Sequence, residues 1–210
     1  MGVVLRVNQN EPSYEVRTRA TRVLRDDGVL VMPTDSVYGI GCMATEGNPA
    51  HERIFQIKRR DRAQTLPWLI GSSTDLNVLG RRVPRWMHLL ADELWPGALT
   101  LVVLASDVIP PEYVAKNGTI ALRVPDSNLV RALAKEVGPL ATTSANIHGA
   151  SAAISGASVD SGIVEQADLT LDAGPAPVAV ASTIVGSSGG RPHILREGAI
   201  PEERIRRLLA

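Results

Sequence analysis

Two polar pairs, far apart in the sequence, carry the kinds of side chain that bind phosphate groups. Lys58 and Arg60 lie at the end of a segment predicted to be helical, and Ser144 and Asn146 come just after a predicted strand. Cationic side chains attract negative oxygens, and a hydroxyl and an amide form directional hydrogen bonds with the same oxygens. A basic run at a helix end is often only a solvated face that complements the helix dipole. Together, however, the two pairs predict a polyphosphate site.

The elements that must position these residues alternate between helix and strand. Apolar residues at helical spacing, with Pro12 before them and Gly28 at their end, predict the first helix. An apolar run that stops at Pro33 then predicts a buried strand. Helices are predicted at 13–27, 49–60, 84–94, 127–137 and from 202, and strands at 29–32, 66–70, 99–104, 119–124 and 139–143 and near 169, 183 and 194. This order predicts an α/β fold in a single domain, residues 1–210.

The composition is that of an ordinary folded protein. Hydrophobic residues make up 44% of the 210 residues and charged residues 21%, which excludes a mainly disordered chain. No apolar run approaches the roughly 20 residues that span a bilayer, and no secretory signal is visible, so we expect a cytoplasmic protein. The formal net charge is zero, so any affinity for nucleic acid must come from local clusters of arginine.

Cysteine and histidine content argues against a disulfide and against a zinc site. Cys42 is the one cysteine, and the four histidines are scattered along the sequence. No nearby histidine supports a nucleophilic Cys42, so a small buried filler is the better interpretation. The glycine-rich and serine-rich stretches 149–162 and 174–181 predict mobile loops, which often carry function.

Gly39, Gly41 and Ala44 match a dinucleotide-binding pattern, but their surroundings argue against that function. The pattern requires a helix to begin at the glycines, whereas Asn48 and Pro49 mark the start of a later one. No glycine is followed by lysine, so a Walker-type phosphate loop is absent. The stretch 33–41 is better interpreted as a hydroxyl-rich and glycine-rich turn after a buried strand, where α/β sheets commonly bind ligands.

This turn, Pro-Thr-Asp-Ser-Val-Tyr-Gly-Ile-Gly, resembles the signature of the YrdC-like family, the threonylcarbamoyl-adenylate synthases. The resemblance covers roughly residues 29 to 200 and is closest to the short form of the family. Further ordered blocks that carry it are Lys58 with Arg60, 95–100, 123–125, 143–146, 182–183 and 195–198.

The resemblance implies both a fold and a reaction. The fold would be an open, twisted, mixed sheet flanked by helices, with a concave basic face. The reaction would be the synthesis of L-threonylcarbamoyl-AMP from L-threonine, bicarbonate and ATP with release of pyrophosphate, the first step of threonylcarbamoyl modification at adenosine 37 of tRNA. A carbamate formed on the threonine amine would attack the α-phosphorus, and the charge on the leaving pyrophosphate must be stabilised.

The resemblance also implies cofactors and partners. Mg²⁺ would accompany ATP, without metal ligands from the protein. RNA binding, to tRNA, and a downstream threonylcarbamoyl transferase complex are implied, and no membrane partner is.

Site residues follow from the resemblance block by block. The implied catalytic residues are Lys58, Arg60, Ser144 and Asn146. ATP would be bound by these four together with Gln64, Thr119 and Arg196. Threonine would be bound by Ser36, Arg123, Thr142 and Ser182. Because a guanidinium presents parallel N–H groups, Arg123 is expected to pair bidentately with the amino acid carboxylate.

The sequence departs from the family pattern at a few positions. Ser36 stands where the family has threonine, and this replacement keeps the hydroxyl group. Four further departures, which affect loop stiffness and nucleotide contacts, are Asp61, Gln64, Thr65 and His148. Asp61 places a negative charge beside Arg60 and is expected to weaken its hold on phosphate.

Two alternatives stay open. One is an RNA-binding YrdC/YciO-type module without adenylating activity, against which the retention of both polar pairs argues. The other is the carbamoyl-adenylate chemistry of hydrogenase maturation proteins, whose acylphosphatase and zinc-finger segments are not found in these 210 residues.

Overall fold

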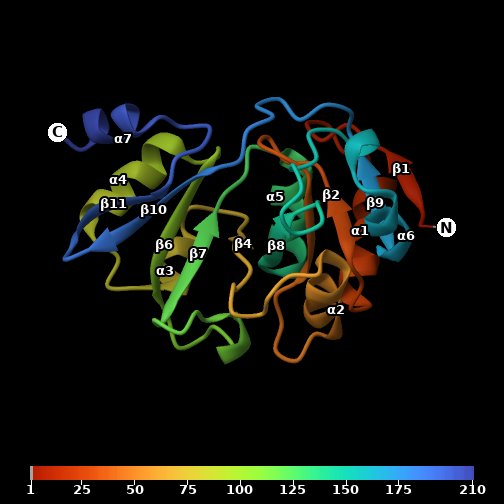
Figure 1. Cartoon of the computed structure of the whole chain (residues 1–210), viewed down its shortest axis with the longest axis horizontal. Coiled ribbons are helices and arrows are strands. Elements are labelled where there is room, and N and C mark those ends of the chain that lie inside the picture. Colours follow the sequence, from red (N-terminus) through yellow and green to blue (C-terminus); the bar gives the residue numbers. More distant parts are fainter. Residues whose placement is uncertain (1) are drawn as a thin grey trace.

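A computed structural model describes residues 2–210 as a mixed α/β fold built on one large sheet (Figure 1). Ten strands follow the order β1-β9-β2-β3-β8-β4-β7-β6-β10-β11, and β5 pairs with β6 outside that path. The strands are β1 Val4–Arg6, β2 Leu30–Met32, β3 Gly39–Met43, β4 Trp68–Leu69, β5 Gly80–Arg81, β6 Leu99–Ala105, β7 Thr119–Arg123, β8 Leu140–Ser144, β9 Leu169–Asp172, β10 Thr183–Ser188 and β11 Arg191–Arg196.

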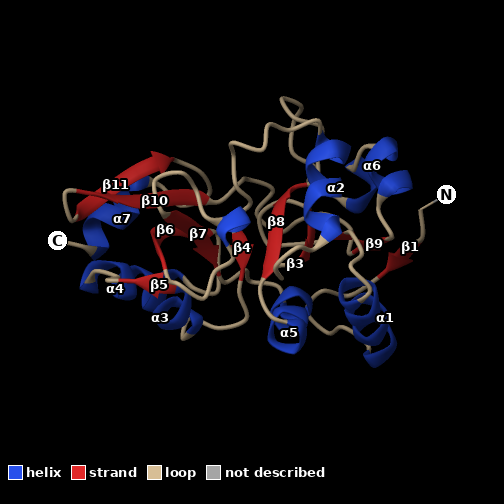
Figure 2. Ribbon diagram, turned by 90° about the horizontal axis from the view of Figure 1, so that it is seen from below, coloured by secondary structure: helices blue, strands red, loops and turns tan. Residues whose placement is uncertain are grey.

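Helices flank this sheet on both sides. In Figure 2, α1 and α5 lie together on one side of the sheet, and α2 and α6 lie together on the other. The helices of residues 2–210 are α1 Tyr14–Arg25, α2 Pro49–Lys58, α3 Asp75–Leu79, α4 Arg85–Leu94, α5 Asn128–Val137, α6 Ser161–Gln166 and α7 Glu202–Leu208, with 3₁₀ turns at Pro111–Tyr113 and Gly156–Ser158. None of these helices is long and apolar enough to cross a membrane.

Strand directions make the sheet mixed, as predicted. β3 and β8 are antiparallel to each other and to their outer neighbours β2 and β4. β4 then runs parallel to β7, and β6 runs parallel to β10. The long connection from β9 to β10, drawn in blue, therefore crosses from one half of the sheet to the other (Figure 1).

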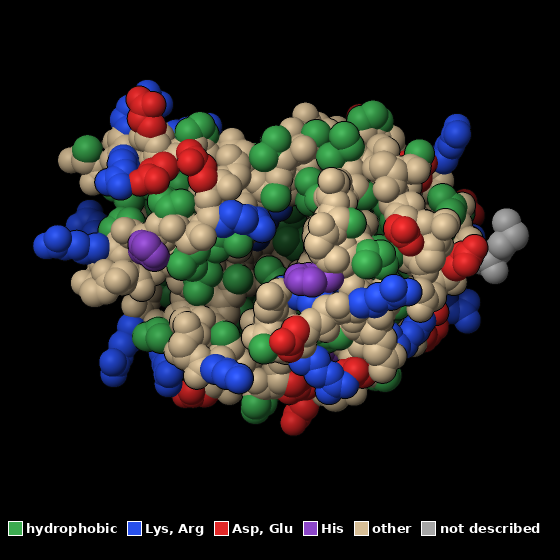
Figure 3. All heavy atoms as spheres, in the orientation of Figure 1, with side chains coloured by type: hydrophobic (Ala, Val, Ile, Leu, Met, Phe, Trp, Pro, Cys, Tyr) green, Lys and Arg blue, Asp and Glu red, His purple; other side chains and the backbone are tan. Residues whose placement is uncertain are grey.

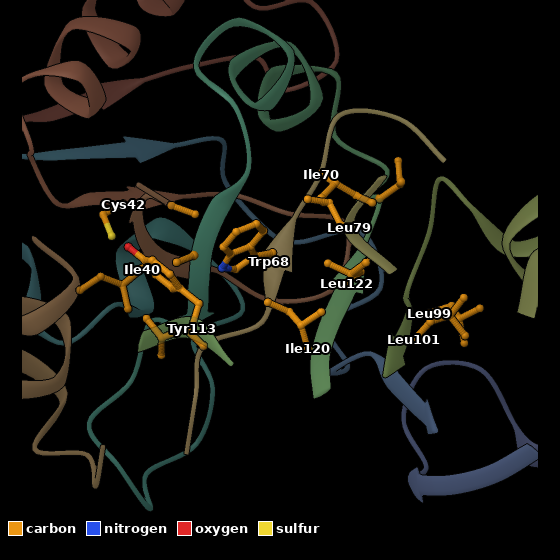
Figure 4. Packing of buried hydrophobic residues seen from close by; sticks show 14 of the residues in the cluster. Ile40, Cys42, Trp68, Ile70, Leu79, Leu99, Leu101, Tyr113, Ile120 and Leu122 are labelled. Carbon is orange, nitrogen blue, oxygen red and sulfur yellow. The ribbon is translucent and has the colours of Figure 1, made fainter. Parts of the chain in front are cut away.

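Two hydrophobic clusters hold the helices against the sheet. The larger contains Trp68, Tyr113 and Leu122, and the rings of Trp68 and Tyr113 meet edge to face with centroids 5.3 Å apart (Figure 4). The smaller packs Leu24 of α1 and Leu133 of α5 against the other face. Successive residues of a strand point to opposite sides, and β2, β4 and β8 accordingly contribute residues to both clusters.

Cys42 lies in the larger cluster and is fully buried, which confirms its interpretation as a core filler. Burial raises the pKa of its thiol to about 12, so the reactive thiolate is not formed at neutral pH.

The first predicted helix is confirmed, with shorter bounds. Ser13 caps it, since its hydroxyl accepts a hydrogen bond from the N–H of Val16. The prediction that Gly28 ends the helix is wrong, because the left-handed residue is Asp27, with φ 54°. The N–H of Gly28 then donates to the carbonyl of Val23 at 2.8 Å.

The prediction of a turn over 33–41 is wrong at its end, because Gly39 and Gly41 belong to strand β3. Both glycines lie under Thr142 of the neighbouring strand, and a Cβ at Gly41 would come 2.5 Å from the Thr142 hydroxyl. Glycine is needed here for close approach of two strands and not for a turn. No helix begins at these glycines, as the sequence analysis expects, since the next helix of the described residues starts at Pro49.

Several further elements differ from the sequence prediction. Ser144 is the last residue of β8 instead of following it, and the strand predicted at 66–70 is reduced to Trp68–Leu69. The stretch 149–162 is more ordered than predicted, since it holds a 3₁₀ turn and the start of α6. The elements missed by the sequence prediction are short: β1, β3, α3, β5 and α6.

Candidate active site

Lys58 ends helix α2 and points into the junction that follows β8. The helix starts at Asn48, whose side chain accepts from the N–H of Ala50, and has proline at its first position. Lys58 is only 1% exposed, and its Nζ donates to the backbone oxygens of Ser144 and Asn146, each at 2.5 Å. The predicted convergence of the two polar pairs is therefore present. The lysine contacts the main chain of the second pair, however, and not its side chains.

Burial changes the protonation of this lysine. It lowers the pKa of Lys58 to about 8, and the positive charge of Arg60 lowers it further. Lys58 is still mostly protonated at neutral pH, and its ammonium group then donates to the two backbone carbonyls. A third N–H of the ammonium has no acceptor among residues 2–210.

Arg60 reaches the same place by a sharp change of chain direction. Arg59 takes a left-handed conformation at the end of α2, with φ 51°, and itself stays exposed. Nη1 of Arg60 then donates to the hydroxyl of Thr143 at 2.9 Å. The Nε atom of Arg60 is shielded from solvent and meets no acceptor within the described chain. Burial also lowers the pKa of the Arg60 guanidinium. Arg60 thus keeps N–H groups that an anion could satisfy.

The side chains of the second pair differ in their availability. The amide nitrogen of Asn146 donates to the carbonyls of Ile147 and Ala150 at 3.0 and 2.7 Å. Its Oδ1 is buried without a partner in residues 2–210. The Oγ of Ser144 forms no hydrogen bond with the described residues, so this hydroxyl is free to donate to a ligand oxygen.

A second cluster surrounds Arg123 at the end of β7. Its Nη1 donates to the Oγ of Ser36 at 2.7 Å, and its Nε donates to the carbonyl of Gly97 at 2.9 Å. Its Nη2 pairs with the carboxylate of Asp35 at 2.5 Å. Burial lowers the pKa of Arg123, and the Asp35 charge opposes that shift. The structure thus brings Ser36 and Arg123 together as predicted, and adds Asp35, which the sequence analysis interprets only as a turn residue.

Ser182 and Arg196 form a third group beside β6. The Ser182 hydroxyl lies 2.8 Å from the hydroxyl of Thr100, and both residues are buried. Nη2 of Arg196 donates to the Ser182 carbonyl at 2.7 Å and to its hydroxyl at 3.3 Å. Burial lowers the pKa of Arg196. Ser182, which is predicted to bind threonine, and Arg196, which is predicted to bind ATP, are therefore in direct contact.

Strand register places three of the predicted residues on one face of the sheet. Trp68 of β4 lies opposite Leu122 of β7 and opposite Ala141 of β8, and all three side chains belong to the larger hydrophobic cluster. Thr119, Arg123 and Thr142, at odd offsets from those core residues, point to the other face. The Thr142 hydroxyl is partly used, since it donates to the Leu140 carbonyl at 3.1 Å.

Thr119 lines a separate hollow of about 410 Å³ between β6, β7, β10 and β11. Val102, Leu195 and His193 also line this hollow, whereas Lys58 and the second polar pair do not. In the view of Figure 3, the centre of the molecule is hollowed, and hydrophobic side chains lie at the floor of this central hollow. Some Lys and Arg side chains lie beside this hollow and the Asp and Glu side chains lie further from it, and the predicted concave basic face stays a prediction.

Two residues of the 59–67 loop differ from expectation. The structure does not bring Gln64 to the site, because it is exposed and its side chain forms no hydrogen bond with the described residues. Asp61 forms no ion pair with Arg60, since its carboxylate accepts from the N–H of Ala63 at 2.8 Å. No direct contact between Asp61 and Arg60 therefore supports the expectation that Asp61 weakens the hold of Arg60 on phosphate.

Sequence analysis does not assign three residues that complete the site, Asp35, Thr100 and Thr143. Each is a partner of a predicted residue across strands that are distant in sequence. All three lie inside the blocks that carry the family resemblance, which is the one signal that could have drawn attention to them.

Comparison with known protein families identifies the family of this chain. A family model for Sua5, YciO and YrdC, described as telomere recombination, matches residues 22–198. The chain belongs to the Sua5/YciO/YrdC family. Membership confirms the resemblance and the mixed α/β architecture predicted from the sequence.

Curated relatives in the Sua5/YciO/YrdC family carry a common name. The threonylcarbamoyl-AMP synthase of Pyrococcus abyssi is 30% identical over 210 residues, which is 100% of this chain and 61% of that protein. The threonylcarbamoyl-AMP synthase of Pseudomonas fluorescens is 31% identical over 182 residues, which is 85% of this chain and 90% of that protein. This chain thus spans about three fifths of one relative and most of the other.

Solved structures of the Sua5/YciO/YrdC family superpose closely on the chain. Sua5 of P. abyssi, crystallised with L-threonine, gives a TM-score of 0.92 at 29% identity, over 99% of this chain and 61% of that one. YciO of Escherichia coli gives a TM-score of 0.84 over 94% of this chain and 96% of that one. At 24% identity, the YciO match supports the fold alone.

Proposed function

We propose that this chain makes L-threonylcarbamoyl-AMP from L-threonine, bicarbonate and ATP, with release of pyrophosphate. The observation that carries the proposal is the buried ammonium of Lys58 at the end of β8, beside Arg60 and Ser144. Relatives of the Sua5/YciO/YrdC family named threonylcarbamoyl-AMP synthase support it. An RNA-binding module without adenylating activity is not favoured, because Lys58, Arg60, Ser144 and Asn146 are all retained.

In this proposal, Lys58, Arg60 and Ser144 act on the phosphates. Bicarbonate and the threonine amine condense to a carbamate with loss of water. A carbamate oxygen then forms a bond to the α-phosphorus while the bond from that phosphorus to the β-phosphate bridging oxygen breaks, and pyrophosphate leaves with the electron pair. Free N–H groups of Lys58 and Arg60 would stabilise the negative charge that develops on the phosphate oxygens. Asn146 would orient the loop through its bonds to Ile147 and Ala150.

The amino acid would bind at the second and third clusters. Arg123 would hold its carboxylate, because one N–H on each terminal nitrogen has no acceptor in residues 2–210. Ser36, Thr142 and Ser182 supply hydroxyls around that position. Sua5 of P. abyssi, whose crystals contain L-threonine, supports an amino acid ligand for this fold.

The nucleotide base would enter the hollow beside Thr119. A volume of about 410 Å³ lies within the range of small-molecule sites, roughly 300 to 1,000 Å³. Val102 and Leu195 give it an apolar lining that suits a planar base, and Arg196, which follows Leu195 in sequence, donates to the Ser182 carbonyl. Gln64 stays a predicted ATP ligand, and it could reach ATP only by movement of its exposed loop.

Mg²⁺ would arrive with ATP. Within residues 2–210, no group of three histidine, cysteine, aspartate or glutamate side chains is arranged to hold a metal ion. The triphosphate oxygens would therefore bind the ion, and water would complete its shell.

The biological setting follows by analogy with the family. The product is a labile mixed anhydride, so a threonylcarbamoyl transferase complex must consume it, with adenosine 37 of tRNA as the final acceptor. Direct tRNA binding and a cytoplasmic location stay predictions, and we propose that residues 1–210 act as a single YrdC-like domain because all strands join one sheet.

The test is pyrophosphate release with the purified chain and with L-threonine, bicarbonate or ATP omitted in turn. We expect release only when all three are present, and a nucleotide product that contains both AMP and the threonylcarbamoyl group by mass spectrometry. Release that does not depend on threonine would overturn the proposed substrate. Absence of release, with strong and salt-sensitive RNA binding, would favour the RNA-binding module instead.

A further inference from the structure

Asp35 lies behind the predicted threonine site and is paired with its arginine. Nη2 of Arg123 is 2.5 Å from Oδ1 of Asp35, and each side chain is only 7% exposed. A buried charge is costly unless it is paired and hydrogen-bonded. The carboxylate therefore allows a charged guanidinium to exist at this depth.

The contacts of Arg123 leave a defined set of donors. A guanidinium has five N–H groups, and protein acceptors take one on each of its three nitrogens: Gly97 O, Ser36 Oγ and Asp35 Oδ1. Two N–H groups then remain without an acceptor in residues 2–210, one on each terminal nitrogen. Two N–H groups, one on each terminal nitrogen, are as many as the two oxygens of a carboxylate can accept in a bidentate pair.

Asp35 is itself fixed from two sides. The same Oδ1 accepts the N–H of Asp126 at 3.0 Å, just beyond the end of β7. Its backbone carbonyl accepts the N–H of Val178 at 2.8 Å, in the crossover from β9 to β10 that leads to Ser182 (Figure 1). Asp35 thus connects Arg123 with the segment that leads to Ser182.

We propose that Asp35 is a positioning residue for the amino acid substrate, which it serves by fixing the direction of the two remaining N–H groups of Arg123. This inference rests on the proposed function. Asp35 need not touch the substrate. With a neutral side chain at position 35, the guanidinium would lose its counter-charge and could turn toward other acceptors, so its fork would no longer be held for a carboxylate.

The first test compares Asp35→Asn with a matched control, Asp126→Asn. Asparagine keeps an acceptor oxygen for Arg123 and for the N–H of Asp126, so the fold should survive. The carboxylate of Asp126 is 66% exposed and pairs with Arg131 outside the site. We expect Asp35→Asn to raise the dissociation constant of L-threonine by calorimetry, and its KM, about 10- to 100-fold, with kcat changed less than about threefold. Asp126→Asn should leave all three values within about twofold.

The second test asks whether Asp35 acts through Arg123. Arg123→Gln removes the fork, so Asp35→Asn added to Arg123→Gln should weaken threonine binding no further. Equal threonine affinity in the parent and Asp35→Asn would overturn the positioning role, and so would additive losses in the double variant. These results are distinct from failure of the proposed function, in which the parent itself would neither bind threonine nor release pyrophosphate.

Discussion

The Nζ atom of Lys58 lies 2.5 Å from the backbone oxygen of Ser144, 86 residues further along the chain. Because the ammonium donates to main-chain oxygens, its contacts depend on the fold of the β8 junction and not on the side-chain rotamers of Ser144 and Asn146. We predict that Lys58→Met lowers kcat/KM for ATP about 100-fold, which corresponds to about 3 kcal/mol of transition-state stabilisation. Lys116→Met, at an exposed lysine, is the control and should change it less than about twofold. Unchanged turnover in Lys58→Met would contradict the role of this ammonium.

The pH dependence of activity should report the same group. Burial lowers the pKa of Lys58 to about 8, so its positive charge is lost as the pH rises through that value. We predict that kcat/KM for ATP, which reflects the free enzyme, falls above about pH 8 with a single ionisation. The decline should be absent in Lys58→Arg, whose guanidinium stays charged over this range. A flat profile of the parent up to pH 10 would contradict the prediction.

Stability should change with pH in the opposite direction. The folded pKa of Lys58 is below its unfolded value, so between about pH 8 and 10.5 the unfolded chain binds more protons than the folded one. Stability contributed by this group therefore rises with pH across that window. Relative to Lys58→Met, the parent should gain at most about 3 kcal/mol of unfolding free energy between those limits. Urea denaturation of both proteins at pH 7.5 and 10.5 measures the difference, and equal changes in the two would contradict it.

Arg59 and Arg60 are adjacent but should behave differently. Arg60 turns inward to Thr143, whereas Arg59 is exposed at the left-handed end of α2. We predict that Arg60→Gln raises KM for ATP about 10- to 100-fold, because a half-buried charge that faces phosphate is lost. Arg59→Gln should change KM less than about threefold. Similar losses in both variants would indicate a general electrostatic effect instead of a direct contact.

The hollow beside Thr119 can be tested by filling it. Val102 lines this hollow, so Val102→Trp should occupy space meant for the nucleotide base and raise KM for ATP at least about tenfold. The affinity for L-threonine should stay within about twofold, since Arg123 and Ser182 lie outside the hollow. Val108→Trp is the control, because Val108 is 66% exposed. Unchanged KM for ATP in Val102→Trp, with the fold intact, would place the base elsewhere.

The amino-acid sequence determines much of the local structure of this protein. Caps, prolines and apolar spacing define α2 and α5 to within a residue or two, because these signals act between residues close in sequence. The ordered motifs also identify the Sua5/YciO/YrdC family, and they predict Lys58, Arg60, Ser144 and Asn146 as site residues. Short elements such as β1 and α3 escape prediction, since three to five residues carry too little pattern.

Only the tertiary structure decides how these residues meet. Gly39 and Gly41 look like turn residues in the sequence, yet they are glycines because strand β8 comes too close for a Cβ. Asp35 looks like a turn former, yet it is the buried counter-charge of Arg123. In each case the cause is a contact between segments about 90 to 100 residues apart, and the free energy of such contacts depends on strand order and register, which no local pattern specifies.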